Sequence, residues 1–97
     1  MAYGLVLAFE GVGEEQYWTV NEKLGIGRDG KGDYPAGLLV HAGGPTPTGW
    51  VVTEVWESKA AQETFMAERL GEALATAGVP APSQVIDTET VNFQQLG

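Results

Sequence analysis

The order in which strand-like and helix-like patterns follow one another constrains the fold of this chain more than any other feature. Strand-like stretches are short runs rich in β-branched and aromatic residues, whereas helix-like stretches repeat apolar residues every three or four positions. The sequence predicts a strand over residues 3–9, a helix over 14–24, strands over 36–42 and 50–56, a helix over 59–77 and a strand over 85–93. This β-α-β-β-α-β order is typical of the ferredoxin-like α+β sandwich, in which two helices cover one face of a four-stranded antiparallel sheet.

Local start and stop signals support these boundaries. Ser58 is a good N-cap for the second helix. Gly78 and Pro80 end that helix, because glycine adopts the left-handed conformation easily and proline cannot continue the hydrogen-bond ladder. The segment 43–49 contains two prolines and three glycines and is predicted as the turn of a hairpin between the second and third strands. The 97 residues suffice for one hydrophobic core, so we expect a single domain over residues 1–97.

The predicted strands are apolar on both faces. In the strand over 50–56, Trp50 and Trp56 alternate with Val51 and Val55. Such strands are usually buried on both sides, but both helices lie on one face and the chain is too short to supply a third layer. We therefore expect the second face to pack against another copy of the protein, giving a homodimer through the sheet. The alternative is a solvated second face.

Charge and residue content argue against several functions. The chain has 13 acidic and 5 basic residues and a net charge of −8, which disfavours binding to nucleic acids and to anionic membranes. It lacks cysteine and has a single histidine, so we expect no metal site and no cofactor. No stretch resembles a secretion signal or approaches the roughly 20 apolar residues that span a bilayer. We therefore expect a cytoplasmic location.

Two residues are candidates for proton chemistry. His41 is the histidine, on an otherwise apolar strand, and Glu54 is a carboxylate in the middle of a strand that is expected to be buried. Pairing residue 41 with residue 52 would place both side chains on one face of the sheet, whereas a slip by one residue would separate them. Alternatively, His41 is a half-buried strand residue bonded to the backbone, and Glu54 is a rim or interface carboxylate that meets Arg69, Lys59 or solvent.

Aromatic residues recur at positions that are expected to face the helices. They serve either as ordinary core residues or as the walls of a pocket for a planar, apolar ligand. The residues assigned to the pocket as substrate-binding residues are Trp18, Trp50, Trp56, Phe65 and Tyr3.

Several short motifs resemble the dimeric α+β barrel proteins, the antibiotic-biosynthesis-monooxygenase-like superfamily. The junction Trp56-Glu57-Ser58 followed by Phe65 resembles the passage from the third strand to the second helix in that superfamily. The segments Gly37-Leu38-Leu39-Val40-His41 and Glu68-Arg69-Leu70 are similar to small uncharacterised members. The resemblance extends over essentially the whole chain in the order of elements.

This resemblance implies a homodimer whose two sheets close into a barrel, with a small-molecule cavity between the sheet and the helices of each protomer. The superfamily contains monooxygenases, isomerases, cyclases and haem-degrading enzymes. The haem-degrading members use a histidine of the second helix as the axial ligand, and residues 66–77 contain none, so we expect no haem.

Together these observations predict a cofactor-independent enzyme that acts on an apolar or aromatic metabolite by proton transfer. The reaction would be an isomerisation, a cyclisation or an anionic oxygenation, with His41 as general acid or base and Glu54 as its partner or a second acid. The alternative is a non-catalytic ligand-binding or structural homodimer, in which both residues serve packing or ion pairing. A cavity beside His41, with Glu54 on the same face, would favour the enzyme.

Overall fold

A computed structural model describes residues 2–94 and 96, and it has the predicted order of elements. The strands are β1 (Ala2–Glu10), β2 (Leu38–Thr46), β3 (Gly49–Trp56) and β4 (Gln84–Thr90). The helices are α1 (Glu14–Lys23) and a longer helix formed by α2 (Lys59–Phe65), η1 (Met66–Leu70) and α3 (Gly71–Thr76). The predicted domain range 1–97 includes residues 1, 95 and 97, which lie outside the described residues.

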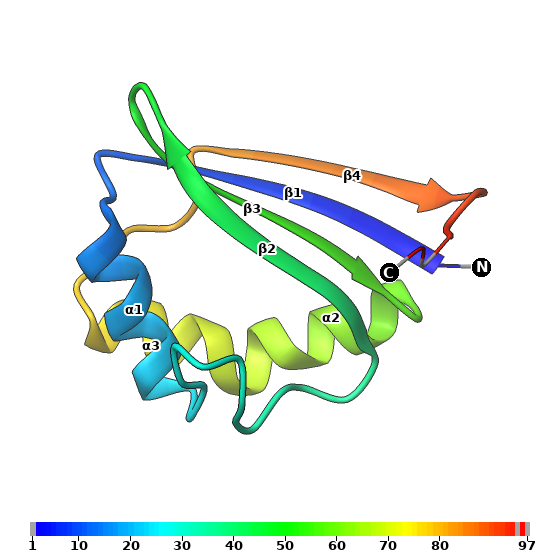
Figure 1. Ribbon diagram of the computed structural model, residues 1–97, viewed down its shortest axis with the longest axis horizontal. Coiled ribbons are helices and arrows are strands. Elements are labelled where there is room, and N and C mark those ends of the chain that lie inside the picture. The colour runs from blue at the N-terminus through cyan, green and yellow to red at the C-terminus, as the bar shows by residue number, and fades with distance from the viewer. Residues whose placement is uncertain (1, 95, 97) are drawn as a thin grey trace.

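The four strands form one antiparallel sheet in the order β2-β3-β1-β4, and both helical segments lie on the same face of it (Figure 1). This confirms the ferredoxin-like α+β sandwich with a four-stranded sheet. Of the described helices, none is long and apolar enough to cross a membrane.

The second helix begins and ends where its sequence signals predicted. The Ser58 hydroxyl accepts a hydrogen bond from the Ala61 amide at 3.2 Å, which is the expected N-cap. Gly78 follows the helix with a φ of 71°, in the left-handed region. Between these ends the helix contains a π turn, in which the Gly71 amide donates to the Met66 carbonyl five residues earlier.

Two strand ends differ from the prediction by three residues or more, and the other strand boundaries differ by two residues or fewer. β2 continues to Thr46, so the expected turn over 43–49 was wrong in its first half. Pro45 is tolerated there because β2 is an edge strand and needs no second hydrogen-bonding neighbour. β4 ends at Thr90 rather than at residue 93, and Thr90 pairs with Ala2, the first residue of β1.

The core lies between the sheet and the helices. On β1 and β3 the inward residues alternate with residues that face away, as period-two strands require. The inward apolar residues of these strands are Tyr3, Leu5, Leu7, Phe9, Trp50, Val52 and Trp56, and they pack on Val20 of α1, on Leu24 directly after α1, and on Phe65, Leu70, Ala73 and Leu74 of the second helical segment. The polar exceptions on this face are therefore the residues that need an explanation.

Candidate functional site

A β-bulge in β2 brings His41 and Glu54 together. The register between β2 and β3 shifts between Leu38 and Val40, and beyond the shift His41 lies directly opposite Glu54. With the pairing of Leu38 and Trp56 continued unchanged, His41 would oppose Thr53 and point to the other face. The bulge reverses that orientation and places both side chains on the helix-facing side. The observed register differs from a pairing of 41 with 52 by two residues, which preserves the shared face.

Hydrogen bonds fix the Glu54 carboxylate between two nitrogen donors. One oxygen lies 2.8 Å from His41 Nδ1, and the other accepts a hydrogen bond from the Trp56 indole at 3.0 Å. The Glu54 side chain is only 6% exposed. A buried carboxylate needs such partners to offset the loss of its hydration. The interaction of His41 with Glu54 therefore belongs to the core and is not a contact at the rim of the sheet.

The histidine continues this line of hydrogen bonds to Tyr17 of α1. His41 Nε2 lies 2.6 Å from the Tyr17 hydroxyl. Because Nδ1 faces the Glu54 carboxylate, the hydrogen-bond pattern assigns the ring proton to Nδ1 and leaves Nε2 as the acceptor of the tyrosine proton. The resulting chain runs from Tyr17 through His41 to Glu54.

The environment of Tyr17 favours its protonated form. Burial raises the pKa of Tyr17 above its usual value of 10.0, and the negative charge of Glu54 raises it further. The Asn21 side chain, one helical turn later, acts in the opposite direction on this pKa by hydrogen bonding. Tyr17 is therefore a neutral phenol at physiological pH, with its proton directed at the histidine.

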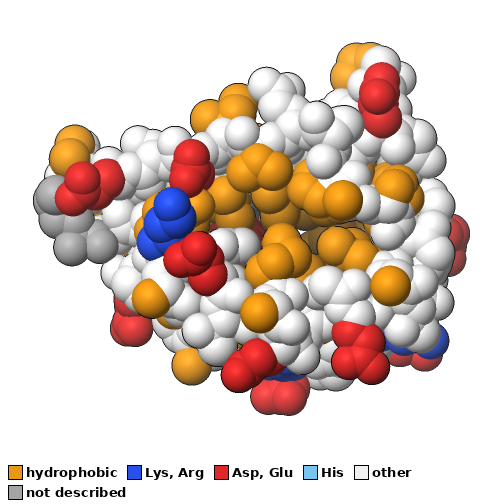
Figure 2. All heavy atoms as spheres, turned by 180° about the vertical axis from the view of Figure 1, so that it is seen from behind, with side chains coloured by type: hydrophobic (Ala, Val, Ile, Leu, Met, Phe, Trp, Pro, Cys, Tyr) orange, Lys and Arg blue, Asp and Glu red, His pale blue; other side chains and the backbone are white. Residues whose placement is uncertain are grey.

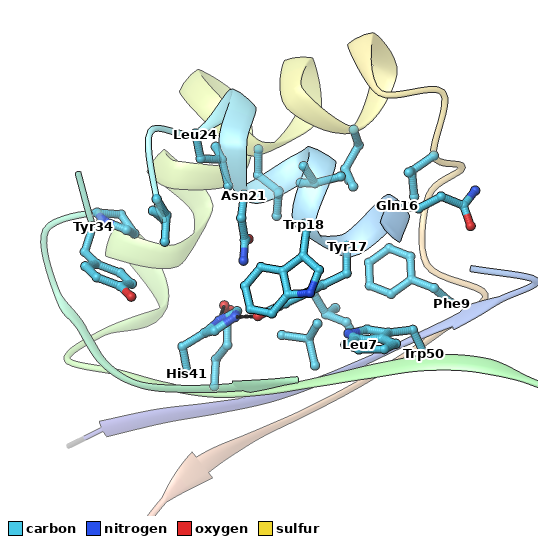
Figure 3. Close-up of a pocket in the computed structure, with 18 of the residues that line it drawn as sticks. Leu7, Phe9, Gln16, Tyr17, Trp18, Asn21, Leu24, Tyr34, His41 and Trp50 are labelled. Carbon is cyan, nitrogen blue, oxygen red and sulfur yellow. Dashed lines mark hydrogen bonds and ion pairs between the residues drawn. The ribbon is translucent and has the colours of Figure 1, made fainter. Parts of the chain in front are cut away.

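A cavity of about 150 Å³ opens beside these hydrogen-bonded side chains, between the sheet and α1 (Figure 3). Its walls are mainly apolar and include Leu7, Phe9, Trp18, Trp50, Phe65 and Leu74. His41, Tyr17 and Asn21 are among its polar lining residues, and in Figure 3 the Asn21 side chain points from α1 into the space between Tyr34 and Trp18. An apolar pocket with a few converging polar groups is the usual form of a small-molecule site.

The predicted substrate-binding residues divide between two places. Trp18, Trp50 and Phe65 line the cavity. Trp56 is fully buried and contributes through its hydrogen bond to Glu54. Tyr3 lies on the β1–β4 side of the sheet and donates to Asp87 of β4 at 2.9 Å. The structure thus groups three of the five predicted side chains around His41.

Tyr3 borders a second, more open hollow of about 360 Å³. It lies between β1, β4 and the second helical segment and is lined by Leu5, Leu7, Met66 and Val85 among others. Figure 2, which shows the molecule from the β4 side, has apolar side chains gathered around a depression. None of the described residues lining this hollow is a histidine.

The site residues predicted from the sequence did not include Tyr17, Asn21 and Arg28, all of which line the cavity. Tyr17 shares a helix face with Val20 and Leu24, and that spacing indicates only that it points inward. Nothing in the sequence pattern shows that it reaches a histidine 24 positions later. Among the described residues, no three histidine, cysteine or acidic side chains cluster in a way that could hold a metal ion.

Comparison with known proteins identifies the fold. No protein-family profile and no curated protein matches the sequence. The structure resembles a proposed antibiotic biosynthesis monooxygenase from Chloroflexus aurantiacus J-10-fl with a TM-score of 0.68 and 18% identity, over 100% of both chains. The chain has the antibiotic-biosynthesis-monooxygenase-like fold.

A second proposed antibiotic biosynthesis monooxygenase, from Deinococcus radiodurans, matches with a TM-score of 0.53 and 16% identity, over 99% of this chain and 96% of that one. The antibiotic-biosynthesis-monooxygenase-like fold was predicted from the motifs around Trp56 and His41, and the two structures confirm it. At this level of identity the likeness concerns the fold, and the chemistry has to be argued from the site.

Proposed function

We propose that the protein is a cofactor-independent enzyme that moves protons on a small apolar or aromatic metabolite. The observation that carries this proposal is the line of hydrogen bonds from buried Glu54 through His41 to Tyr17, which ends at the wall of an apolar cavity. Additional support comes from the names of the two solved structures with the same fold, which describe both as proposed antibiotic biosynthesis monooxygenases.

The geometry defines how a proton would move. Tyr17 is a phenol at neutral pH, so its oxygen can accept a proton from the substrate only as its own proton passes to His41 Nε2. The imidazolium formed on His41 is then stabilised by the Glu54 carboxylate 2.8 Å from Nδ1. The substrate loses one proton and becomes an anion, while the protein gains one proton on His41. The apolar walls limit competition from water for these charges.

The substrate anion has three outcomes that match the expected reaction types. Return of the proton from Tyr17 to a different carbon atom gives isomerisation. Attack of the anion on a carbonyl group of the same molecule gives cyclisation. Addition of the anion of a CH2 group to dioxygen, as a second substrate, gives a hydroperoxide after protonation by His41 through Tyr17, and loss of water from it leaves a carbonyl group. One oxygen atom enters the product and the other leaves as water, which is the monooxygenase type. Proton removal is common to all three, so it is the step to test.

Hydrogen–deuterium exchange tests that step without knowledge of the natural substrate. Acetophenone and 2-tetralone, two enolisable aromatic ketones, are incubated with the protein in heavy water, and deuterium uptake at carbon is followed by mass spectrometry. We expect protein-dependent uptake that falls at least about a hundredfold in Tyr17→Phe and His41→Gln. Tyr3→Phe is the matched control and is expected to retain it, because Tyr3 lies outside the cavity.

Two results would contradict the proton-transfer proposal. One is an absence of protein-dependent uptake with either ketone. The other is uptake in Tyr17→Phe at the rate of the unmodified protein. Binding of the ketones without exchange would instead support the alternative of a non-catalytic ligand-binding protein.

We propose further that the functional unit is a homodimer through the uncovered face of the sheet. The outward-facing residues in the middle of the four strands are uncharged although the chain carries a net charge of −8. They are Val6, Ala8, Val40, Ala42, Val51, Thr53, Val55 and Ile86, and in Figure 1 no element of the described chain covers this face. An uncharged face of this kind fits a second copy of the same face.

Light scattering after size exclusion tests the homodimer. We expect twice the 10.3 kDa mass of the chain for the unmodified protein. Thr53→Lys, in the middle of this face, should shift the mass to 10.3 kDa, whereas Thr64→Lys on the exposed side of α2 should not. A single-chain mass for the unmodified protein, or an unchanged dimer in Thr53→Lys, would contradict the proposal.

A further inference from the structure

Arg28 lines the cavity beside the proposed proton-transfer residues, and it is the one arginine or lysine among the described lining residues. We propose that Arg28 binds an anionic group of the ligand, and that the substrate class is therefore small aromatic carboxylic acids. This inference rests on the proposed function, since it concerns the same cavity. It concerns the group of the substrate that is bound by the protein but takes no part in the proton transfer.

The backbone around Arg28 is ordered by a short hairpin. The Gly30 amide donates to the Gly27 carbonyl at 3.1 Å, so Arg28 and Asp29 occupy the two central positions of a turn. The Gly27 amide donates to the Lys31 carbonyl at 2.8 Å, and the Lys31 amide donates to the Asp29 side chain at 3.0 Å. Arg28 is thus presented at a defined position at the tip of the hairpin.

Arg69 ties the base of this hairpin to the second helical segment. Its guanidinium donates to the carbonyls of Leu24 and Asp33, both at 2.7 Å, and lies 3.4 Å from the Asp33 carboxylate. These carbonyls flank the hairpin on either side, so Arg69 holds its two ends together. Because Arg69 is engaged in this way, it is a positioning residue for the hairpin, and Arg28 is left as the cation that can meet a ligand.

The Arg28 side chain retains free donors. Its guanidinium carbon lies 5.0 Å from the centroid of the Trp18 ring, which itself lines the cavity. It forms an ion pair with Glu15 at 3.7 Å, and because the two side chains are 61% and 88% exposed this contact is long and screened by solvent. A guanidinium has five N–H donors in a fork that matches a carboxylate, so most of them remain available.

Because the rest of the molecule is negatively charged, binding of an anionic ligand in this cavity depends on Arg28. The chain carries −8 overall, and the carboxylate of Glu54 lies within the cavity wall. Without a local cation, an anionic ligand would be repelled from this site. The structure supplies that cation on the face of Trp18, beside apolar walls that suit an aromatic ring. A ring flanked by a carboxylate and an enolisable group matches both features.

The test compares 4-acetylbenzoate with its methyl ester, which has nearly the same shape but no charge. Dissociation constants are measured by NMR titration of the labelled protein. We expect the acid to bind about tenfold more tightly than the ester, in line with a charge-assisted hydrogen bond that is partly exposed to solvent. In Arg28→Gln the preference should fall to within about twofold. Lys31→Gln removes the same charge from the same hairpin outside the cavity and should keep the preference.

The outcomes separate this inference from the proposed function. Equal binding of acid and ester by the unmodified protein, or a preference that survives in Arg28→Gln, would overturn the role of Arg28. Loss of the preference in Lys31→Gln as well would attribute it to overall charge and also overturn that role. Tyr17→Phe should keep the acid preference while it loses proton exchange, so the two proposals fail on different measurements. Binding of neither probe would overturn aromatic carboxylic acids as the substrate class, while the proposed function is decided by the proton-exchange measurement.

Discussion

The two sides of the helix-covered sheet face each link a tyrosine hydroxyl to a carboxylate, and the links differ in what they can do. On the β2–β3 side, Tyr17 reaches the buried Glu54 through His41. On the β1–β4 side, Tyr3 donates directly to the exposed Asp87. A hydrogen bond to a charged carboxylate holds the tyrosine proton in place, whereas an imidazole acceptor can take the proton over.

The spaces beside the two tyrosines reinforce that difference. The hollow beside Tyr3 is the larger and more open of the two, yet the residues proposed for proton transfer border the smaller cavity beside Tyr17. Volume and apolar lining alone therefore do not locate a site. We place the proposed site beside Tyr17 because of the acceptor that faces this tyrosine, and three pairs of variants test that choice.

The largest expected difference is in stability. Glu54→Ala leaves the Trp56 indole and the His41 Nδ1 group without their acceptor in the core, and we expect a loss of about 2–4 kcal/mol in the free energy of unfolding. Asp87→Ala removes an exposed partner of Tyr3, and we expect a loss below about 1 kcal/mol. Urea denaturation measures both values. Similar losses would show that the two links are equivalent and would contradict the comparison.

The next difference concerns the packing around Tyr17. A methyl group on Gly43 would lie 3.0 Å from both the Trp50 indole nitrogen and the Tyr17 ring, whereas one on Gly44 would meet nothing within 4 Å. Trp50 Nε1 is already buried without a hydrogen-bond partner among the described residues, so an added methyl group beside it finds little room and offers no compensating hydrogen bond. We expect Gly43→Ala to cost about 1–3 kcal/mol and Gly44→Ala to be close to neutral. Equal melting temperatures for the two variants would indicate that the Tyr17 side is loosely packed.

The smallest difference appears at high pH. Burial, followed by the hydrogen bond to Asp87, raises the pKa of Tyr3 from 10.0 to about 12. Folding therefore favours the neutral phenol, and this contribution to stability is complete below about pH 10 and disappears as the pH rises towards 12. The free energy of unfolding should fall over that range, and less steeply in Tyr3→Phe.

Asp87→Asn is the matched variant for this pH dependence. It should flatten the slope only in part, because burial is the larger cause of the raised pKa. A slope in Tyr3→Phe identical to that of the unmodified protein would mean that Tyr3 is not held as a phenol by its surroundings.

Most of the fold was accessible from the sequence because each element carries its own periodicity. The N-cap at Ser58 and the stop at Gly78 lie where local chemistry placed them. The end of β2 was not accessible, because Gly43, Gly44 and Pro45 have turn composition and continue the strand only through pairing with β3. Strand pairing is a long-range property that composition does not report.

The candidate site was accessible only in part for the same reason. His41 and Glu54 stand out as polar residues in apolar strands, and they remain a prediction as catalytic residues. Whether they meet depends on a bulge near Leu39, which changes the register by one residue and leaves no mark in the hydrophobic pattern. Tyr17 lies on an apolar helix face. The helical spacing predicts that its side chain points into the core, but it does not predict that the side chain contacts His41.

In the proposed mechanism the proton between His41 and Glu54 rests on Nδ1 of the imidazole, so that Nε2 can receive the proton of Tyr17. Nitrogen-15 NMR of histidine-labelled protein tests it directly, because the chain has a single histidine and gives one pair of ring resonances. We expect a ring proton on Nδ1 and an acceptor at Nε2, in a spectrum that changes in Tyr17→Phe. A proton on Nε2 alone, or a spectrum unaffected by Tyr17→Phe, would contradict it.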